Sequence, residues 1–520
     1  MRNLWAVARE TFVQGTRSRI ITIFIILIAC WIFYIGLTVE GDGTLKGKIQ
    51  TFLAYSTSLT QLFLSLATIF LTTTIITRDI RYKHIFTVIT KPIARWQYVA
   101  GRWLGVIFLN AVLLFPTMGV IYLMAEYLRR QPTAYELKMT SARQALSGLR
   151  DPDRAAVENE LFSARAMFQP DPFDIKGTLQ QRWKKLIEEK GLNNLIIQHI
   201  KKKLRKGKDK TIAIDETEIE KQLHNIAVRE KIIKEIKDEL RKQILGEIEL
   251  VNPGSSLRLT FSGLKPNQND KRLELRYKLH PFRAYRKTLS SIWHVVNPET
   301  GYDQIIPRTD SPDTTSSIII SPQAITSKGK LVVYYINVPM GRKKTIVKVK
   351  PDEIGLYQQV GSFEGNISRA GLVILSRLMF LAAAAVMFGV FLSFPIACLA
   401  CLLVFSLGMM SAFLFDATRI VPAASPGAFD YFSHHLVRGI FIFIPTFSGT
   451  SAVNALVDGV NISWGNLLKE YALIISPSGA NDGLWSSLGF KIEVGTGFRA
   501  ILSLIIAWLI FRRRQLGQAT

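Results

Sequence analysis

Long apolar runs separated by polar stretches are the dominant pattern of this chain, and they predict helices that cross a membrane. Six runs approach the ~20 residues that a helix needs to cross the hydrocarbon core. They cover residues 20–38, 52–77, 104–127, 371–392, 395–415 and 497–511. No small-residue cleavage signal follows the first run, so we expect it to be an anchor and not a removed signal peptide.

The polar segment 78–105, between the second and third runs, carries six Lys or Arg residues and one acid, Asp79. Basic clusters beside spans stay in the cytoplasm, because positive charge resists translocation. The clusters at 2–19 and 512–514 fall on the same side if the amino terminus is inside. We therefore expect a multi-pass protein of a bacterial-type cytoplasmic (plasma) membrane, with both termini in the cytoplasm and membrane lipid as one partner.

The same polar segment also has a helical pattern. Ile85, Val88 and Ile89 have the i, i+3, i+4 spacing of one helix face. Pro92 should end that helix, because proline has no N–H to donate and disfavours helical backbone in the residue before it. A second helix is expected to begin near Arg95 and to run into the membrane.

This topology places the long stretch 128–365 outside the cytoplasm. Apolar positions recur at helical spacing within 178–206 and 219–244, which predicts a helical hairpin. From 255 to about 358 the spacing changes to two, which predicts the short strands of a small β-sandwich. The expected strands are 257–261, 273–277, 318–320, 331–338 and 345–350.

The expected fold class is therefore an α-helical membrane protein with six transmembrane helices and an inserted extracytoplasmic α+β region. Residues 1–127 would hold a short interfacial helix and spans one to three. Residues 128–250 would form the helical insert and 251–365 the β-sandwich-like insert. Residues 366–520 would hold spans four to six, with 416–496 as an extracytoplasmic or re-entrant helical loop.

Two polar residues inside the predicted spans, Arg377 and Asn110, are candidates for a transport pathway or for contacts between helices. A charge inside a span is costly and usually faces a partner or an aqueous path. Arg377 would alternatively lie near the interface and extend its guanidinium to the headgroups. The basic run 201–210 is either the solvated end of a helix or a contact for anionic ligands.

No pattern typical of an enzyme occurs in the sequence. A phosphate-binding loop GxxxxGK[ST], a HExxH zinc motif and a GxSxG elbow are all missing. Cys398 and Cys401 have CxxC spacing, but in an apolar run small buried side chains explain them better than redox or metal chemistry. The net charge is +25, yet the topology makes nucleic acid an unexpected partner.

Residues 85–96, with the sequence IFTVITKPIARW, are followed by Tyr98, Gly101 and Gly105. This stretch resembles the segment between the second and third spans of permease subunits of type-2 ABC exporters. That family has six spans and a short amphipathic elbow helix before the first, and the resemblance covers about 1–127 and 366–520. Residues 454–464 and the basic end 512–514 are similar to the family too.

The resemblance implies that the 78–105 segment forms coupling helices that contact a separate ATPase subunit. The implied coupling residues are Asp79, Arg81, Ile85, Val88, Ile89, Lys91, Pro92, Arg95 and Trp96. The chain itself would be no enzyme and would hold no cofactor, with ATP bound on the partner. A second permease chain, identical or related, would complete the pathway. The alternative is a membrane-anchored extracytoplasmic binding or sensor protein without transport.

Overall fold

The computed structural model describes residues 2–82, 94–133, 152–173, 175–207, 226–266, 273–282, 288–339, 345–417, 428–445, 447, 452–477 and 490–513. They fold into two compact units. Unit 1 is formed by Met1–Arg165 with Val360–Thr520, and unit 2 by Ala166–Gln359. The described residues are mostly helical, with a separate β-sheet region.

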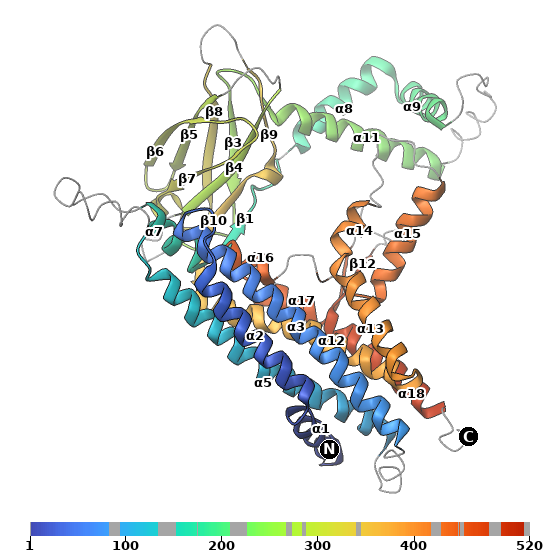
Figure 1. Ribbon diagram of the computed structural model, residues 1–520. Helices are drawn as coiled ribbons and strands as arrows, with labels where there is room; N and C mark the ends of the chain where they lie inside the picture. The colour runs from blue at the N-terminus through green and yellow to red at the C-terminus, as the bar shows by residue number, and fades with distance from the viewer. Residues whose placement is uncertain are drawn as a thin grey trace, which may run out of the picture. The chain divides into compact units, whose positions relative to one another are not determined.

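Unit 1 is a helical bundle (Figure 1). Its long helices are α1 (Arg2–Thr16), α2 (Arg19–Thr38), α3 (Leu45–Arg81), α5 (Arg95–Arg129), α12 (Phe363–Phe391) and α18 (Thr496–Arg513). Four of them, α2, α3, α5 and α12, are long and apolar enough to cross a membrane. In their most apolar windows, 78% of α12 is buried but only 22% of α2. α12 is therefore central to the bundle, while α2 leaves most of its apolar surface free to contact lipid.

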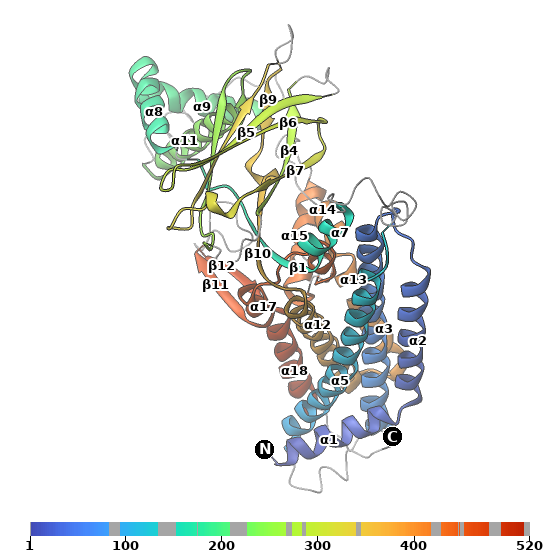
Figure 2. The ribbon, with the colours of Figure 1, turned by 90° about the vertical axis from the view of Figure 1, so that its left-hand side faces the viewer.

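Two sequence predictions about this bundle are confirmed. The second helix expected within the polar segment 78–105 begins at Arg95, as α5. The interfacial helix expected before the first span is present as α1. Figure 2 shows α1 lying across the ends of α2, α3 and α5. One face of α1 is buried and the other is exposed. Val7, Ala8, Thr11 and Gly15 are buried, whereas Trp5 is 63% exposed.

The prediction of one continuous helix over 395–415, the fifth span, is wrong. The structure has α13 (Phe394–Met409) followed by the short α14 (Ser411–Ala417). The carbonyl of Gly408 accepts a hydrogen bond from the Phe447 N–H at 2.9 Å. A Cβ at position 408 would lie only 2.6 Å from the Phe447 ring. Glycine thus permits a second segment to approach the end of α13, where the regular helix stops.

The rest of unit 1 is made of the 16-residue helix α15 (Ala428–Phe443) and of short elements. The short elements are α7 (Pro152–Ala156), the π-helix η1 (Val157–Leu161), α16 (Ala452–Val457), α17 (Trp464–Tyr471), β11 (Leu473–Pro477) and β12 (Phe490–Val494). The helical loop expected at 416–496 is helical in part, as α15, α16 and α17, but it also contains β11 and β12, which pair antiparallel. Strand pairing satisfies backbone groups that a loop would leave open.

Unit 2 is built mainly on two sheets. Its strands, together with the connecting strand β1, are β1 (Ser163–Phe168), β2 (Leu250–Val251), β3 (Ser256–Phe261), β4 (Leu273–Pro281), β5 (Leu289–Asn297), β6 (Tyr302–Asp310), β7 (Thr315–Ile320), β8 (Leu331–Asn337), β9 (Val347–Val349) and β10 (Gly355–Ser362). One sheet has the order β1-β10-β4-β9-β2, with β7 also on β4, and the other has the order β3-β8-β5-β6. The 3-10 turns η2 (Pro322–Ala324) and η3 (Pro351–Glu353) connect strands. Tyr277, Trp293 and Tyr335 lie at the centre of one shared core.

All five predicted strands are present. The sequence did not lead us to predict β1, β2 and β10, and it also left out β5 and β6. They form a hairpin that pairs from Asn297 and Tyr302 outward to Leu289 and Asp310. Gly301 has φ +69° in the turn, a backbone that glycine adopts without strain. The β-branched and aromatic residues within 289–297 and the turn sequence PETG were signals that could have revealed it.

Three helices complete unit 2: α8 (Lys176–Lys190), α9 (Leu192–Gly207) and α11 (Ile226–Ile248). The single helix predicted over 178–206 is wrong, because Gly191 with φ +73° separates α8 from α9. Ile232 on α11 packs with Ile196 of α9, and Ile244 packs with α8. The predicted start of the second helix near 219 and the side chains of the basic run 201–210 lie outside the described residues.

Candidate functional site

The described residues on either side of the 83–93 segment meet in a buried ion pair. Arg102, on the second turn of α5, places its Nη2 2.6 Å from Oδ2 of Asp79, near the end of α3. Arg102 is 3% exposed and Asp79 is 4% exposed. The hydroxyl of Tyr98 donates a hydrogen bond to the same carboxylate oxygen at 2.7 Å. These contacts therefore join the end of α3 to the start of α5.

Helix α1 takes part in the same cluster. Nη1 of Arg102 donates to the Thr11 hydroxyl at 3.1 Å and to the Gln14 amide oxygen at 3.2 Å. Nη2 also lies 3.5 Å from the carboxylate of Glu10. A buried guanidinium needs such partners, because an unpaired charge away from water costs several kcal/mol, of order ~3–5 when one partner is removed. We call Glu10, Thr11, Gln14, Asp79, Tyr98 and Arg102 the arginine cluster.

The end of α18 reaches the same place. Nη1 of Arg95 donates to the backbone carbonyl of Arg512 at 2.7 Å. The rings of Tyr98 and Phe511 stack with their centres 5.9 Å apart. A cation near the last carbonyls of a helix is favourable, because these groups have no partner within the helix. Four helices, α1, α3, α5 and α18, are therefore joined at the end of α3 and the start of α5.

Two glycines allow α1 to lie directly on α5. A Cβ at Gly101 would lie 2.8 Å from the Val7 side chain, and one at Gly105 would lie 2.5 Å from the Ala8 carbonyl oxygen. Small residues four apart on one helix permit this close packing of helices in membranes. The glycines thus bring Thr11 within reach of Arg102.

The predicted coupling residues differ in burial and in position. Asp79 and Arg95 lie in or beside the arginine cluster. Arg81 is exposed, and Trp96 is 48% exposed next to the 83–93 segment. The other predicted residues, Ile85, Val88, Ile89, Lys91 and Pro92, lie outside the described residues. Sequence reasoning did not single out Arg102, although an arginine within an otherwise apolar helix was a signal.

The two candidates inside the spans have different surroundings. Asn110 accepts a hydrogen bond from the Thr68 hydroxyl at 3.1 Å, a contact between α5 and α3. Arg377 is 4% exposed in the middle of α12, so the alternative of a side chain extended to the headgroups is wrong. Its Nη1 lies 3.4 Å from the Gln61 amide oxygen, and its guanidinium lies 5.9 Å from the Phe447 ring. Its Nε has no hydrogen-bond partner among the described residues.

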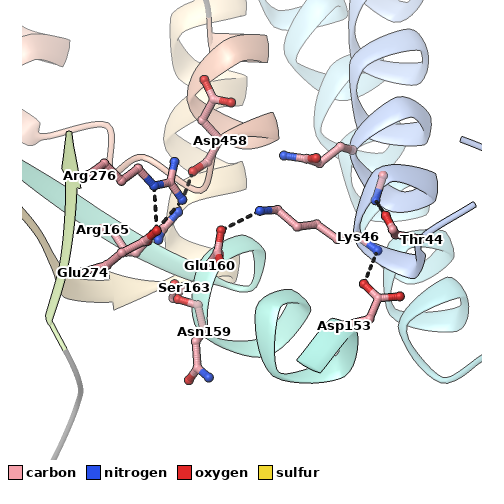
Figure 3. A network of polar contacts seen from close by, with 12 residues as sticks. Thr44, Lys46, Asp153, Asn159, Glu160, Ser163, Arg165, Glu274, Arg276 and Asp458 are labelled. Atoms are coloured by element: carbon pink, nitrogen blue, oxygen red, sulfur yellow. Dashed lines mark hydrogen bonds and ion pairs between the residues drawn. The ribbon is translucent and has the colours of Figure 1, made fainter. Parts of the chain in front are cut away.

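A second polar network holds the other end of α3 (Figure 3). The Asp153 carboxylate accepts from the backbone N–H groups of Leu45 at 2.6 Å and Lys46 at 3.2 Å, which is favourable at a helix start. Lys46 pairs with Glu160 at 2.5 Å. Hydrogen bonds from Thr44 lower the pKa of the Asp42 carboxyl just before the helix. α3 is therefore fixed at both ends.

Comparison with known proteins adds no assignment: no family model matches the chain, and no similar curated protein or solved structure was found. Among the described residues, no group of three or more His, Cys, Asp or Glu side chains is placed to hold a metal ion. What the structure establishes is four helices able to cross a membrane, a separate β-sheet region, and the arginine cluster at one end of the bundle.

Proposed function

We propose that the chain is the permease subunit of an ATP-driven exporter of the type-2 ABC class. In this proposal it spans the bacterial-type membrane six times, with α13 and α18 as the fifth and sixth spans and both termini in the cytoplasm. The observation that carries the proposal is the arginine cluster, which joins α1, α3 and α5, together with the Arg95 contact that holds the end of α18 to α5. These contacts lie at the helix ends that the 83–93 segment connects. A segment with that support is suited to receive force from another protein.

The arginine cluster would transmit such force. α3 and α5 run through the bundle from this point, and both contribute to its main core with α12. A partner that displaced the 83–93 segment would move α3 and α5 together, because Asp79 and Arg102 cannot separate without leaving a buried charge unpaired. Rigid helices with packed cores shift between alternative arrangements as bodies, which is the motion that alternating access requires.

Arg377 supports a polar route through the bundle. Thr57 and Thr60 lie on the same face of α3 as Gln61, and their hydroxyls have no hydrogen-bond partner in the described part of the chain. Buried polar groups without partners are costly, so their presence next to Arg377 favours a site that a transported molecule fills. Unit 2 would receive that molecule outside the cytoplasm, and a second permease chain would complete the pathway.

Co-purification of an ATPase subunit tests the coupling role. In native membranes, we expect the full chain to co-purify with a subunit that carries its own phosphate-binding loop, identified by mass spectrometry. Deletion of residues 91–95 should abolish the association, and Trp96→Ala should weaken it. Trp464→Ala is the matched control, because Trp464 is 61% exposed on α17, away from the arginine cluster. Unchanged recovery of the ATPase after the deletion would refute the coupling role.

A second candidate function rests on unit 2. This unit has its own core around Trp293, so it resembles an independent binding domain carried on a membrane anchor. In that case no ATPase would associate, and Arg377→Gln would not change the protein's activity. Ligand binding by unit 2 without any ATP-dependent step would favour this candidate over the exporter.

A further inference from the structure

A pocket of about 800 Å³ opens between α1, the start of α2 and the last turns of α3. Its wall includes four arginines: Arg9, Arg17, Arg19 and Arg78. Glu10 is the one acid among the described residues of the wall. Nothing in the proposed transport function uses this pocket.

The arginines of the pocket lack anionic partners within the described part of the chain. None of the four forms an ion pair with an acid among the described residues. Glu10 lies 3.5 Å from Arg102, and the Gln14 amide oxygen, also in the wall, accepts from Arg102 at 3.2 Å. Arg102 therefore binds the acceptor groups of Glu10 and Gln14. The four arginines leave the pocket with a strong positive charge. Such a concave basic site attracts a negatively charged ligand.

The same wall is partly apolar, and it lies at the edge of the membrane-spanning region. Val13, Leu71 and Ile75 line it beside the arginines. The apolar part of α2 begins directly after Arg19, and large side chains such as Ile23 remain exposed on it. A ligand with an anionic group next to hydrocarbon would satisfy both parts of the wall.

We propose that this pocket binds the headgroup of an anionic phospholipid. The guanidinium groups would contact the phosphate, for which arginine is suited because its donors form a planar fork. The acyl chains would continue along α2 and α3. Basic pockets between helices at the membrane surface are known sites of this chemistry. The bound lipid would connect α1 to α2 and α3, and the proposal requires only that α2 and α3 cross a membrane, not that the chain transports anything.

Lipid titration of the full-length protein in neutral detergent tests the proposal. Thermal unfolding and native mass spectrometry would be followed with phosphatidylglycerol, with zwitterionic phosphatidylcholine and with soluble glycerol phosphate. We expect phosphatidylglycerol to raise the unfolding temperature and to remain bound, and the other two to do neither. Equal protection by glycerol phosphate would overturn the proposal in favour of a soluble phosphate ligand, and equal protection by phosphatidylcholine would overturn it as well.

Variants locate the site. Arg17→Gln/Arg78→Gln and Arg9→Gln/Arg19→Gln should each weaken phosphatidylglycerol binding at least tenfold, while their unfolding temperatures without lipid stay unchanged because these side chains are exposed. Arg2→Gln/Arg513→Gln is the control: it removes the same charge from exposed positions of unit 1 outside the pocket. If the control weakened binding as much, or if both pocket variants bound as the natural protein does, the pocket would not be the lipid site.

Discussion

Arg102 and Arg377 are both buried arginines on apolar helices, but their surroundings differ. Arg102 has an acid at 2.6 Å and several further acceptors, whereas Arg377 has one amide oxygen at 3.4 Å and an aromatic ring. A fully paired charge holds a structure together, while a poorly paired one is retained at a cost to stability. Arg102 therefore joins helices, whereas Arg377 is the residue that a transported molecule would contact in the proposed function.

The ion pair of the arginine cluster gives a prediction at this scale. Asp79→Asn and Arg102→Met should each lower the free energy of unfolding by about 3 kcal/mol, because each leaves a buried charge without its partner. The double variant Asp79→Leu/Arg102→Met should recover most of the loss. Tyr98→Phe is the milder control, since it removes one hydrogen bond worth about 1 kcal/mol. Unfolding in mixed micelles measures all four, and additive losses in the double variant would contradict the pairing.

At the scale of elements, contacts at glycines and in the sheet core decide how the pieces join. Gly101 and Gly105 admit α1 to the surface of α5, and Gly408 admits Phe447 to the end of α13. In unit 2, Tyr277, Trp293 and Tyr335 come from three strands and meet in one core, with ring centres 4.3 and 5.0 Å apart. Both kinds of contact depend on close packing, which tolerates little added volume.

Gly105→Val should displace α1 from α5, because the new side chain would begin 2.5 Å from the Ala8 carbonyl oxygen. We expect a lower unfolding temperature and faster proteolysis within residues 2–19. Gly119→Val, on the same helix, is the matched control, since no atom lies within 4 Å of a Cβ built there. Equal effects of the two substitutions would show that helix propensity, and not the packing of α1, is responsible.

Unit 2 should lose stability in alkali. Burial raises the pKa of Tyr277 above its ordinary value of 10.0, as does its hydrogen bond to Asp310, and burial raises the pKa of Tyr335 as well. Because both folded-state pKa values exceed the unfolded value, the stability that these groups contribute is complete below pH 10 and declines as the pH rises above it. Near-ultraviolet circular dichroism of the full chain should show unfolding at lower temperature at pH above about 10, and Tyr277→Phe/Tyr335→Phe should reduce this dependence.

At the scale of the whole molecule, unit 2 is an insertion whose entry and exit lie together. The chain enters it after Arg165 and leaves it at Val360. A Cβ at Gly361 would lie 3.5 Å from the Cβ of Ala164, so the two connecting strands are neighbours. Insertions with adjacent ends can be removed without stretching the domain that hosts them.

Replacing residues 166–359 by a short Gly-Ser linker should therefore leave unit 1 folded. We expect the shortened chain to insert into membranes, to show a single sharp peak in size-exclusion chromatography, and to keep the ATPase partner of the proposed function. It should lose export, because the unit that receives the molecule is missing. Aggregation of the shortened chain, with the full chain soluble under the same conditions, would show that unit 1 needs unit 2 to fold.

Local sequence pattern was sufficient for part of this picture. The apolar runs located α2, α3, α5 and α12, the pattern after Pro92 placed a helix start at Arg95, and period-two alternation located five strands. Hydrophobic periodicity is a property of neighbouring residues, so it can be read without knowing what they pack against. The hairpin of β5 and β6 was equally readable but was missed.

What the sequence by itself determined is therefore four helices of membrane length, α2, α3, α5 and α12, and the position of the polar segment between α3 and α5. Only the tertiary structure decided that Asp79 and Arg102, 23 residues apart (102 − 79), form a buried pair, that Arg377 is enclosed with few partners, and that four arginines line one pocket. The physical reason is that burial and charge pairing depend on which helices pack together, and packing joins residues that no local pattern connects.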